Sequence, residues 1–256
     1  MKTTKQTTTT GDTQVKSNRQ AATIVGILFI FATVSAILGL YFYTPILSGP
    51  DYLINGATYK NQVALGALME LILVCTAIGT AIGLFPVLKP YGERIALGHL
   101  FFRFLEAAVI TVGIVAVLSL STLSQTFVAT DAPDAAAFGA VGSLLHAVYK
   151  WTSMLGPLFF LGVNTFMYSY LLYKSNLVPR PLALFGLTGA TLVFGASLVV
   201  LSGVASQFST PVVLMVMPIA FFEMVFAGWL IVKGFNPAAI AAESGKTETH
   251  ALLSAA

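Results

Sequence analysis

The sequence predicts an all-α fold, a polytopic transmembrane bundle of six helices with the N-terminus and the C-terminus in the cytoplasm. Three observations support this prediction. Only 9% of the 256 residues are charged, whereas a soluble domain carries about 25%, so the chain cannot cover its own surface with polar groups. Six apolar segments are each long enough to cross a bilayer, which takes about 20 residues. Lysine and arginine gather on one side of these segments, as they do in cytoplasmic loops.

The first three spans are separated by polar breaks. Residues 1–20 are polar and rich in Thr, so we expect a disordered cytoplasmic tail before the first span, 21–43. That span is longer than the apolar run of a secretory signal, which is about 7–15 residues. A loop with Pro, Gly and Asp over 44–61 leads to the second span, 62–88. A short turn with Pro and basic residues leads to the third span, 95–124.

The fourth span, 139–173, is unusually long. Its 35 residues would reach about 52 Å as a straight helix at about 1.5 Å per residue. We therefore expect this span to tilt, to bend or to project from the membrane. Gly156-Pro157 predicts a kink, because Pro157 cannot donate a hydrogen bond to the carbonyl of Ser153.

The fifth and sixth spans, 182–204 and 211–233, are joined by a tight polar turn. Pro218 predicts a second kink, in the sixth span. The residues that follow, 234–256, are small and polar, so we expect a second disordered cytoplasmic tail. Residues 21–233 therefore form a single transmembrane domain.

The distribution of basic residues sets the predicted orientation. With the N-terminus inside, the outer loops hold one basic residue, Lys60, and the inner side holds ten. The ten are Lys2, Lys5, Lys16, Arg19, Lys89, Arg94, Lys174, Arg180, Lys233 and Lys246. Because positive residues favour the cytoplasmic side, we expect both termini there. The net charge of +3 is small and not clustered, which argues against a nucleic-acid partner.

Five formally charged residues lie inside the predicted spans. They are Glu70, Arg103, Glu106, Lys150 and Glu223. A charged side chain at the bilayer centre costs about 2.5–3.5 kcal/mol on insertion scales, so these residues should meet one another, or water, inside the bundle. Helix rise from the nearest span end places all five near the middle of the hydrocarbon core.

The polar residues of two spans fall on single helix faces. At about 100° per residue, His99, Arg103 and Glu106 form one narrow stripe in the third span. In the fourth span one face carries both the proline and the strongly polar residues: His146, Lys150, Ser153, Pro157 and Asn164. Each stripe marks the face that turns toward the interior of the bundle.

The charges inside the spans do not balance. Three carboxylates against two cations leave a formal charge of −1 with the histidines neutral, and a medium of low dielectric constant disfavours that excess. We expect one carboxyl group to be protonated or one histidine to be charged. Such a site is able to exchange a proton.

Arg103 and Glu106 have two interpretations. At positions i and i+3 they fit an internal ion pair that locks the bundle. They also fit a functional polar site, which we prefer because ionisable residues inside membranes generally mark function.

The other polar candidates have structural interpretations as well. His99 fits a residue near the inner interface that is tethered to a backbone carbonyl group. His146 fits a structural and a functional role equally well. Trp151 fits packing better than ligand contact, and Asn164 fits an interhelical hydrogen bond.

Several activities can be argued against. No zinc-protease HExxH, hydrolase GxSxG, Walker A or Rossmann GxGxxG motif occurs, so the sequence favours a protein that is not an enzyme and indicates no cofactor. His99 and His146 lie at different depths from opposite faces, which argues against one shared haem iron. No ligand spacing indicates a metal site.

Seven stretches carry a resemblance to a known family. They are AATIVGILFIFATVSAILG, PILSGPDYL, NQVALGALMELI, ALGHLFFRFLEA, KWTSMLGPLFFLGVNT, LVPRPLALFGLTGA and WLIVKGFNP. With them the chain resembles, over nearly its whole length, a family catalogued as domain of unknown function 4386. The resemblance implies a six-span bacterial membrane protein, and thus a multi-pass protein of the bacterial cytoplasmic (inner) membrane. It implies no activity, substrate or catalytic residue.

Three functions remain open at this point. The leading one is a small-solute or proton-coupled transporter with a polar cluster near the midplane. The alternatives are an intramembrane enzyme that acts on a lipid-like substrate, and a structural or sensory protein whose ion pairs only specify packing. The expected partners are the lipid bilayer and a small-molecule or lipid ligand. The candidate ligand-binding or coupling residues are Arg103, Glu106, Glu70, Glu223, Lys150, His146, Asn164 and Trp151.

Overall fold

The computed structural model describes residues 4–131 and 133–242, with side chains described from residue 18 onward. Helices make up nearly all of this part of the chain, and it contains no strand. Six helical stretches are long and apolar enough to cross a membrane: Asn18–Phe42, Lys60–Tyr91, Glu93–Ala129, Ala135–Ser175, Arg180–Leu201 and Thr210–Val232. The prediction of an all-α bundle with six membrane helices is therefore confirmed, and each stretch overlaps one predicted span.

The elements follow one another with short connections. In chain order they are α1 (Thr4–Phe42), α2 (Thr44–Leu47), α3 (Tyr52–Thr58), α4 (Lys60–Leu88), the 3-10 turn η1 (Lys89–Tyr91), α5 (Glu93–Ala129), α6 (Ala135–Met154), the π-helical segment η2 (Leu155–Phe160), α7 (Leu161–Ser175), α8 (Arg180–Leu201) and α9 (Thr210–Val232). The predicted loop 44–61 thus contains two short helices. They pack back against α5, where the Ser124 hydroxyl donates a hydrogen bond to the Tyr52 carbonyl at 3.2 Å.

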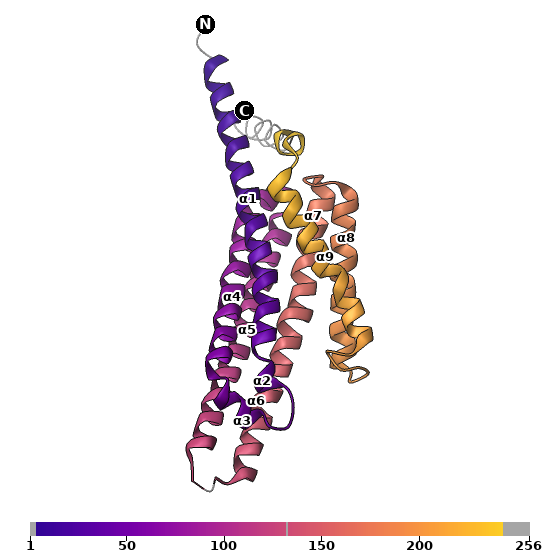
Figure 1. Ribbon diagram of the computed structural model, residues 1–256. Coiled ribbons are helices and arrows are strands. Elements are labelled where there is room, and N and C mark those ends of the chain that lie inside the picture. The colour runs from indigo at the N-terminus through magenta and orange to yellow at the C-terminus, as the bar shows by residue number, and fades with distance from the viewer. Residues whose placement is uncertain (1–3, 132, 243–256) are drawn as a thin grey trace.

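Helix α1 begins well before the membrane segment inside it, which starts at Asn18. We expected residues 1–20 to be a disordered tail, but the helix includes residues 4–20, and residues 1–3 lie outside the described part. The physical reason is cooperativity, because each residue added to an existing helix gains a backbone hydrogen bond without a new nucleus. In Figure 1 this part of α1 rises beyond the rest of the bundle.

The fourth span projects from the bundle, as its length predicted. Helix α5 continues to Ala129, past the predicted end at 124, and pairs with α6 in a hairpin that extends beyond the other helices (Figure 1). Asp134 starts α6 as an N-cap, since its carboxylate accepts hydrogen bonds from the backbone nitrogens of Ala136 and Ala137 at 3.1 Å. The predicted loop 124–138 is therefore much shorter than expected.

The predicted irregularity at Gly156-Pro157 is the π-helical segment η2. Pro157 has no N–H group, and the wider π-helical turn accommodates the missing hydrogen bond. Gly156 lies against α5, where an added Cβ would come within 3.0 Å of the Ile110 side chain. Glycine thus lets the interrupted helix approach α5 closely. Pro218, in contrast, lies inside α9, which is one continuous helix.

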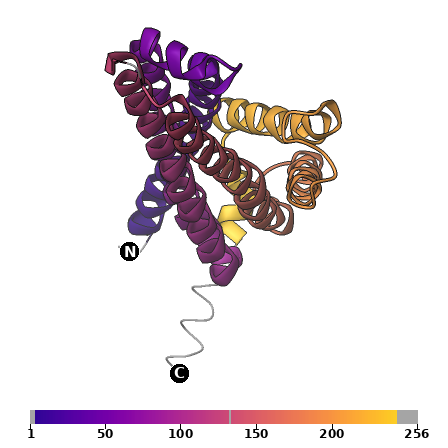
Figure 2. The same cartoon turned by 90° about the horizontal axis from the view of Figure 1, so that it is seen from below.

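The helices form a closed ring. Helix α1 packs on α4, α4 on α5, α5 on α7, α7 on α8, α8 on α9, and α9 packs back on α1. We call the end with the start of α1 and the end of α9 the terminal end, and the opposite end, with the α5–α6 and α8–α9 connections, the loop end. Toward the loop end the α8–α9 hairpin diverges from the α5–α6 hairpin, as Figures 1 and 2 show.

The core near the terminal end is aromatic. Phe29, Tyr168, Phe222 and Phe226 are buried there with ring centroids 5.5–6.2 Å apart. These four residues, which we call the aromatic cluster, join α1, α7 and α9. Stacked and edge-on rings fill this part of the bundle, and the buried Tyr168 hydroxyl is a polar atom inside it that has no hydrogen-bond partner among the described residues.

The chain after α9 docks back onto the bundle. Phe235 is buried in the same core as the aromatic cluster, and the Asn236 backbone nitrogen donates to the Leu177 carbonyl at 2.8 Å. We expected 234–256 to be a disordered tail, but its described part, 234–242, is ordered by these contacts. The sequence did not indicate this order, because Phe235 is the only aromatic residue in a stretch of small and polar residues. The rest of that tail lies outside the described residues.

Candidate functional site

The centre of the candidate site is an ion pair on one helix. Arg103 and Glu106 lie three residues apart on α5, and the Arg103 Nη1 atom is 3.2 Å and 3.0 Å from the two Glu106 carboxylate oxygens. Each residue is only 3% exposed. Neutralisation inside the pair offsets part of the cost of placing two charges at membrane depth. The helical stripe predicted from the sequence thus faces the interior.

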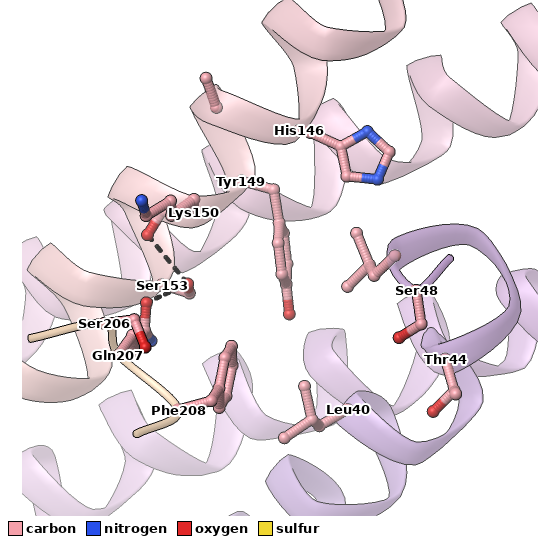
Figure 3. A pocket seen from close by; sticks show the side chains of 12 residues that line it. Leu40, Thr44, Ser48, His146, Tyr149, Lys150, Ser153, Ser206, Gln207 and Phe208 are labelled. Carbon is pink, nitrogen blue, oxygen red and sulfur yellow. Dashed lines mark hydrogen bonds between the residues drawn. The ribbon is translucent and has the colours of Figure 1, made fainter. Parts of the chain in front are cut away.

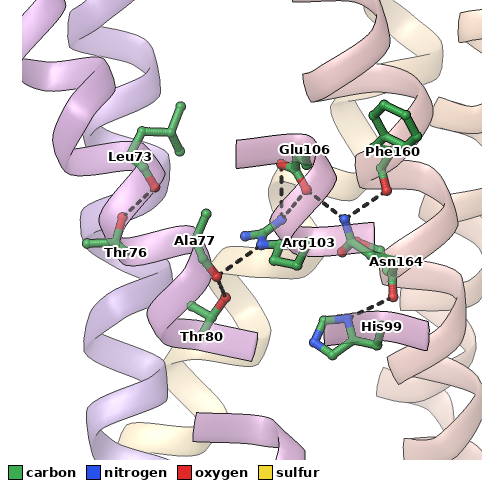
Figure 4. A network of polar contacts seen from close by, with 10 residues as sticks. Leu73, Thr76, Ala77, Thr80, His99, Arg103, Glu106, Phe160 and Asn164 are labelled. Carbon is green, nitrogen blue, oxygen red and sulfur yellow. Dashed lines mark hydrogen bonds and ion pairs between the residues drawn. The ribbon is translucent and has the colours of Figure 1, made fainter. Parts of the chain in front are cut away.

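Two neighbouring helices complete the network, shown in Figure 4. On one side, Arg103 Nε donates to the backbone carbonyl of Ala77 in α4 at 3.3 Å. On the other side, the Asn164 amide nitrogen of α7 donates to Glu106 Oε2 at 2.6 Å and to the Phe160 carbonyl at 2.8 Å. The predicted interhelical hydrogen bond of Asn164 is therefore confirmed. Because Phe160 is the last residue of η2, the network also holds the end of the π-helical segment.

His99 extends the network toward the terminal end. Its Nδ1 atom lies 3.2 Å from the Asn164 carbonyl, so the predicted tether to a backbone carbonyl is confirmed. Since a carbonyl group only accepts, Nδ1 carries the hydrogen. The imidazole packs edge-on against Tyr168 with ring centroids 5.1 Å apart. His99 therefore lies between the ion pair and the aromatic cluster.

A third carboxylate, Glu223 on α9, faces the ion pair. It lies on the buried side of α9, between Ile219 and Ala227, and interacts electrostatically with both Arg103 and Glu106. Its Oε1 atom is buried and has no hydrogen-bond partner in the described part of the chain. One buried cation thus has two carboxylates near it, and only Glu106 is paired with it.

Glu70 belongs to a different group of residues. It is half-buried on α4 and interacts with Tyr43 and Tyr149, whose rings meet edge-on at 5.9 Å. The Tyr43 hydroxyl approaches the Glu70 carboxylate, but the pair does not reach hydrogen-bond geometry within the described contacts. The sequence did not indicate these partners: Tyr43 lies near a span end, which ordinarily marks the membrane interface, and nothing in the sequence pairs Tyr149 with Glu70.

Lys150 and Trp151 lie away from the ion pair as well. Lys150 is exposed on α6, and its Nζ atom lies 5.5 Å from the centre of the Trp151 ring. One turn further on, the Ser153 hydroxyl donates to Gln207 Oε1 in the α8–α9 turn at 3.3 Å. Lys150 is therefore level with a polar turn at the loop end and not with the bundle centre. The expected depth was wrong because the α5–α6 hairpin, from whose end we counted, projects beyond the other helices.

His146 on α6 connects this helix to α2 through a hydrogen bond. Its Nδ1 atom is 3.1 Å from the Gly142 carbonyl, and its Nε2 atom is 3.1 Å from the Ile46 carbonyl. The Tyr52 ring packs edge-on against the imidazole at 4.5 Å. Of the eight candidates, the structure therefore brings together Arg103, Glu106, Asn164 and Glu223, and it places the other four elsewhere.

A family model described as a domain of unknown function (DUF4386) matches residues 24–234. The chain belongs to this family. No curated protein and no solved structure matches the chain. The matched range contains all four residues around the ion pair, so the candidate site of this DUF4386 chain lies within the domain that defines the family.

The DUF4386 chain also has a pocket of about 520 Å³ at the loop end. It is lined by the end of α1, by α2, by α6 and by the α8–α9 turn. Figure 3 shows Leu40 and Phe208 on one side of it, Lys150 and Gln207 on another, and the Tyr149 side chain pointing between them. The sequence did not reveal this pocket, because the residues that line it come from four separate segments.

Proposed function

We propose that the protein is a proton-coupled transporter of a small solute in the bacterial cytoplasmic membrane, with both termini in the cytoplasm. One observation carries the proposal. A single buried cation, Arg103 on α5, has two carboxylates near it on different helices, Glu106 on α5 and Glu223 on α9.

Proton occupancy decides which carboxylate holds the cation. The three charges sum to −1, an excess that a medium of low dielectric constant disfavours. A proton on Glu106 removes its charge and leaves Glu223 as the only anion next to Arg103. A proton on Glu223 leaves the α5 pair intact. The two protonation states therefore differ in whether Arg103 binds α5 alone or links α5 to α9.

The surrounding helices are able to respond to such a change. Helix α9 belongs to a hairpin that packs on α7 and α1. At the loop end its turn touches α6 through the hydrogen bond between Ser153 and Gln207, and the two hairpins otherwise diverge there. On α7, Asn164 joins Glu106 to the carbonyl that ends η2. A π-helical segment with a proline is a recognised hinge and is common at functional sites. A pairing switch at Arg103 thus acts on two elements that can move.

The site is closed on one side. The aromatic cluster fills the core between the ion pair and the terminal end, and His99 packs on Tyr168 at its edge. In the expected orientation this is the cytoplasmic side. Transporters with a midplane site block one side at a time and often bind at interrupted helices, and the arrangement of η2 and the aromatic cluster fits that plan.

The test is charge movement after a pH jump. Proteoliposomes adsorbed on a solid-supported membrane should give a transient current on acidification, because a proton enters the site. Glu106→Gln and Glu223→Gln should each abolish or strongly reduce it. Glu93→Gln is the matched control, since Glu93 pairs with Lys89 on the surface, and it should keep the full current. A wild-type protein without a current, or a current unchanged in both variants, would overturn the proposal.

A further inference from the structure

We propose that the pocket at the loop end is a binding site for an anionic amphiphile, with the head group at Lys150 and the acyl chain on the apolar wall. The pocket is separate from the ion pair, and this inference does not rest on the transport function. Its volume of about 520 Å³ falls within the range of small-molecule sites, about 300–1,000 Å³.

The chemistry of the pocket is divided between its sides. Leu40, Leu47 and Phe208 supply apolar surface, whereas Lys150 and Gln207 supply polar groups. Leu40 is 44% exposed and Phe208 is 65% exposed, so the apolar wall continues into the lipid-facing surface of the bundle. An acyl chain is therefore able to enter sideways from the bilayer.

The polar side lies where lipid head groups lie. Gln207 belongs to the polar turn between α8 and α9, and Ser153 on α6 holds it at the level of Lys150. A turn that joins two membrane helices marks the membrane–water interface. Lys150 therefore projects into the head-group region, where a lysine on a long side chain is well accommodated.

The charge of Lys150 favours an anionic ligand, because no carboxylate of the described residues neutralises it. Neither of the two ion pairs found among the described residues involves Lys150. Its ammonium group lies over the Trp151 ring, a contact that leaves hydrogen-bond donors available. Gln207 Oε1 accepts from Ser153, which leaves the amide nitrogen as a second donor beside Lys150. Two donors next to apolar surface match a carboxylate or phosphate carrying an acyl chain.

Quenching of Trp151 fluorescence tests this inference. The chain has two tryptophans, so Trp229→Phe leaves Trp151, next to Lys150, as the only reporter. In one arm the protein is reconstituted with acyl-brominated phosphatidylglycerol or phosphatidylcholine at equal mole fraction. In the other arm, brominated fatty acid is added to vesicles of unbrominated phosphatidylcholine. The arm in which the anionic compound quenches Trp151 fluorescence more strongly shows whether the amphiphile is a membrane lipid or a free fatty acid.

In one of the arms, we expect the anionic amphiphile to bind about fivefold more tightly than the zwitterionic lipid, as read from the quenching of Trp151. This is the size typical of one basic residue near a membrane surface. Lys150→Gln should remove the preference, and Lys174→Gln, at the terminal end, should keep it. Ala147→Leu, which fills the pocket without changing charge, should weaken quenching by the anionic amphiphile. Equal quenching by anionic and zwitterionic lipid with no response to fatty acid, or a preference that survives in Lys150→Gln, would overturn the inference.

Discussion

Replacement of Glu106 by glutamine removes one of the two carboxylates near Arg103 without changing the shape of the side chain. If Glu106 were the sole partner, Arg103 would remain as a buried unpaired charge, and such a loss costs about 3–5 kcal/mol. Glu223 interacts with the same cation and can take over the pairing. We therefore expect Glu106→Gln to lower the free energy of unfolding by only about 1–2 kcal/mol, well below the cost of an unpaired charge.

Glu223→Gln and the double variant test whether both carboxylates stabilise Arg103. Glu223→Gln removes an attraction to Arg103 but also a repulsion from Glu106, so the stability of this variant should change little. The double variant leaves Arg103 without any carboxylate and should lose about 3–5 kcal/mol. The two substitutions should therefore be coupled by about 1–4 kcal/mol, whereas residues in one network are typically coupled by about 0.5–3 kcal/mol.

The assay is reversible unfolding in mixed detergent micelles, read as a double-mutant cycle over wild type, the two single variants and the double variant. The same cycle with Glu93→Gln in place of Glu223→Gln is the control. Because Glu93 is exposed, it should show no coupling energy with Glu106→Gln. Additivity of Glu106→Gln and Glu223→Gln within about 0.5 kcal/mol would refute the idea that both carboxylates serve one cation.

Three further predictions follow from the same structure. Asn164→Leu removes the donor at 2.6 Å from Glu106 and should lower the free energy of unfolding by about 1–2 kcal/mol. The same unfolding assay measures this change, and an unchanged stability would mean that this hydrogen bond adds nothing. Gly66→Leu should disturb the packing of α1 on α4, because a Cβ there would lie 3.2 Å from the Gly39 carbonyl oxygen of α1 and 2.7 Å from the Tyr43 ring that follows α1. Gly139→Ala, with open space around it, should leave the melting temperature unchanged, and equal melting temperatures of the two variants would contradict this. In a cysteine-free background, a membrane-impermeant maleimide should label Asp131→Cys but not Lys174→Cys in intact cells, and the reverse pattern would invert the proposed orientation.

The sequence predicted the fold well because the bilayer imposes a length on each helix. The six spans follow from runs of apolar residues, and the projection of the fourth span follows from its excess length. The ordered segment after Lys233 was missed, because its apolar contacts, the buried Phe235 and the partly buried Ile240, stand among small and polar neighbours.

The candidate site was predicted in part. Helix geometry fixes which residues of one helix share a face, so the stripe of Arg103 and Glu106 and the inward direction of Asn164 followed from spacing alone. Partners on other helices depend on the rotation and vertical offset of each helix, which composition does not encode. Glu70 and Lys150 were therefore assigned to the same layer as Arg103, although the first faces two tyrosines and the second lies at the loop end.

The most direct measurement of the pairing switch is the infrared difference spectrum of the reconstituted protein between high and low pH. We predict that a protonated-carboxyl stretching band appears on acidification, that Glu106→Gln removes or shifts it, and that Glu223→Gln changes the pH at which it appears. Glu70→Gln serves as the control for the separate carboxylate on α4 and should leave these features in place. A spectrum without any pH-dependent carboxyl band, or a band that only Glu70→Gln removes, would contradict the account.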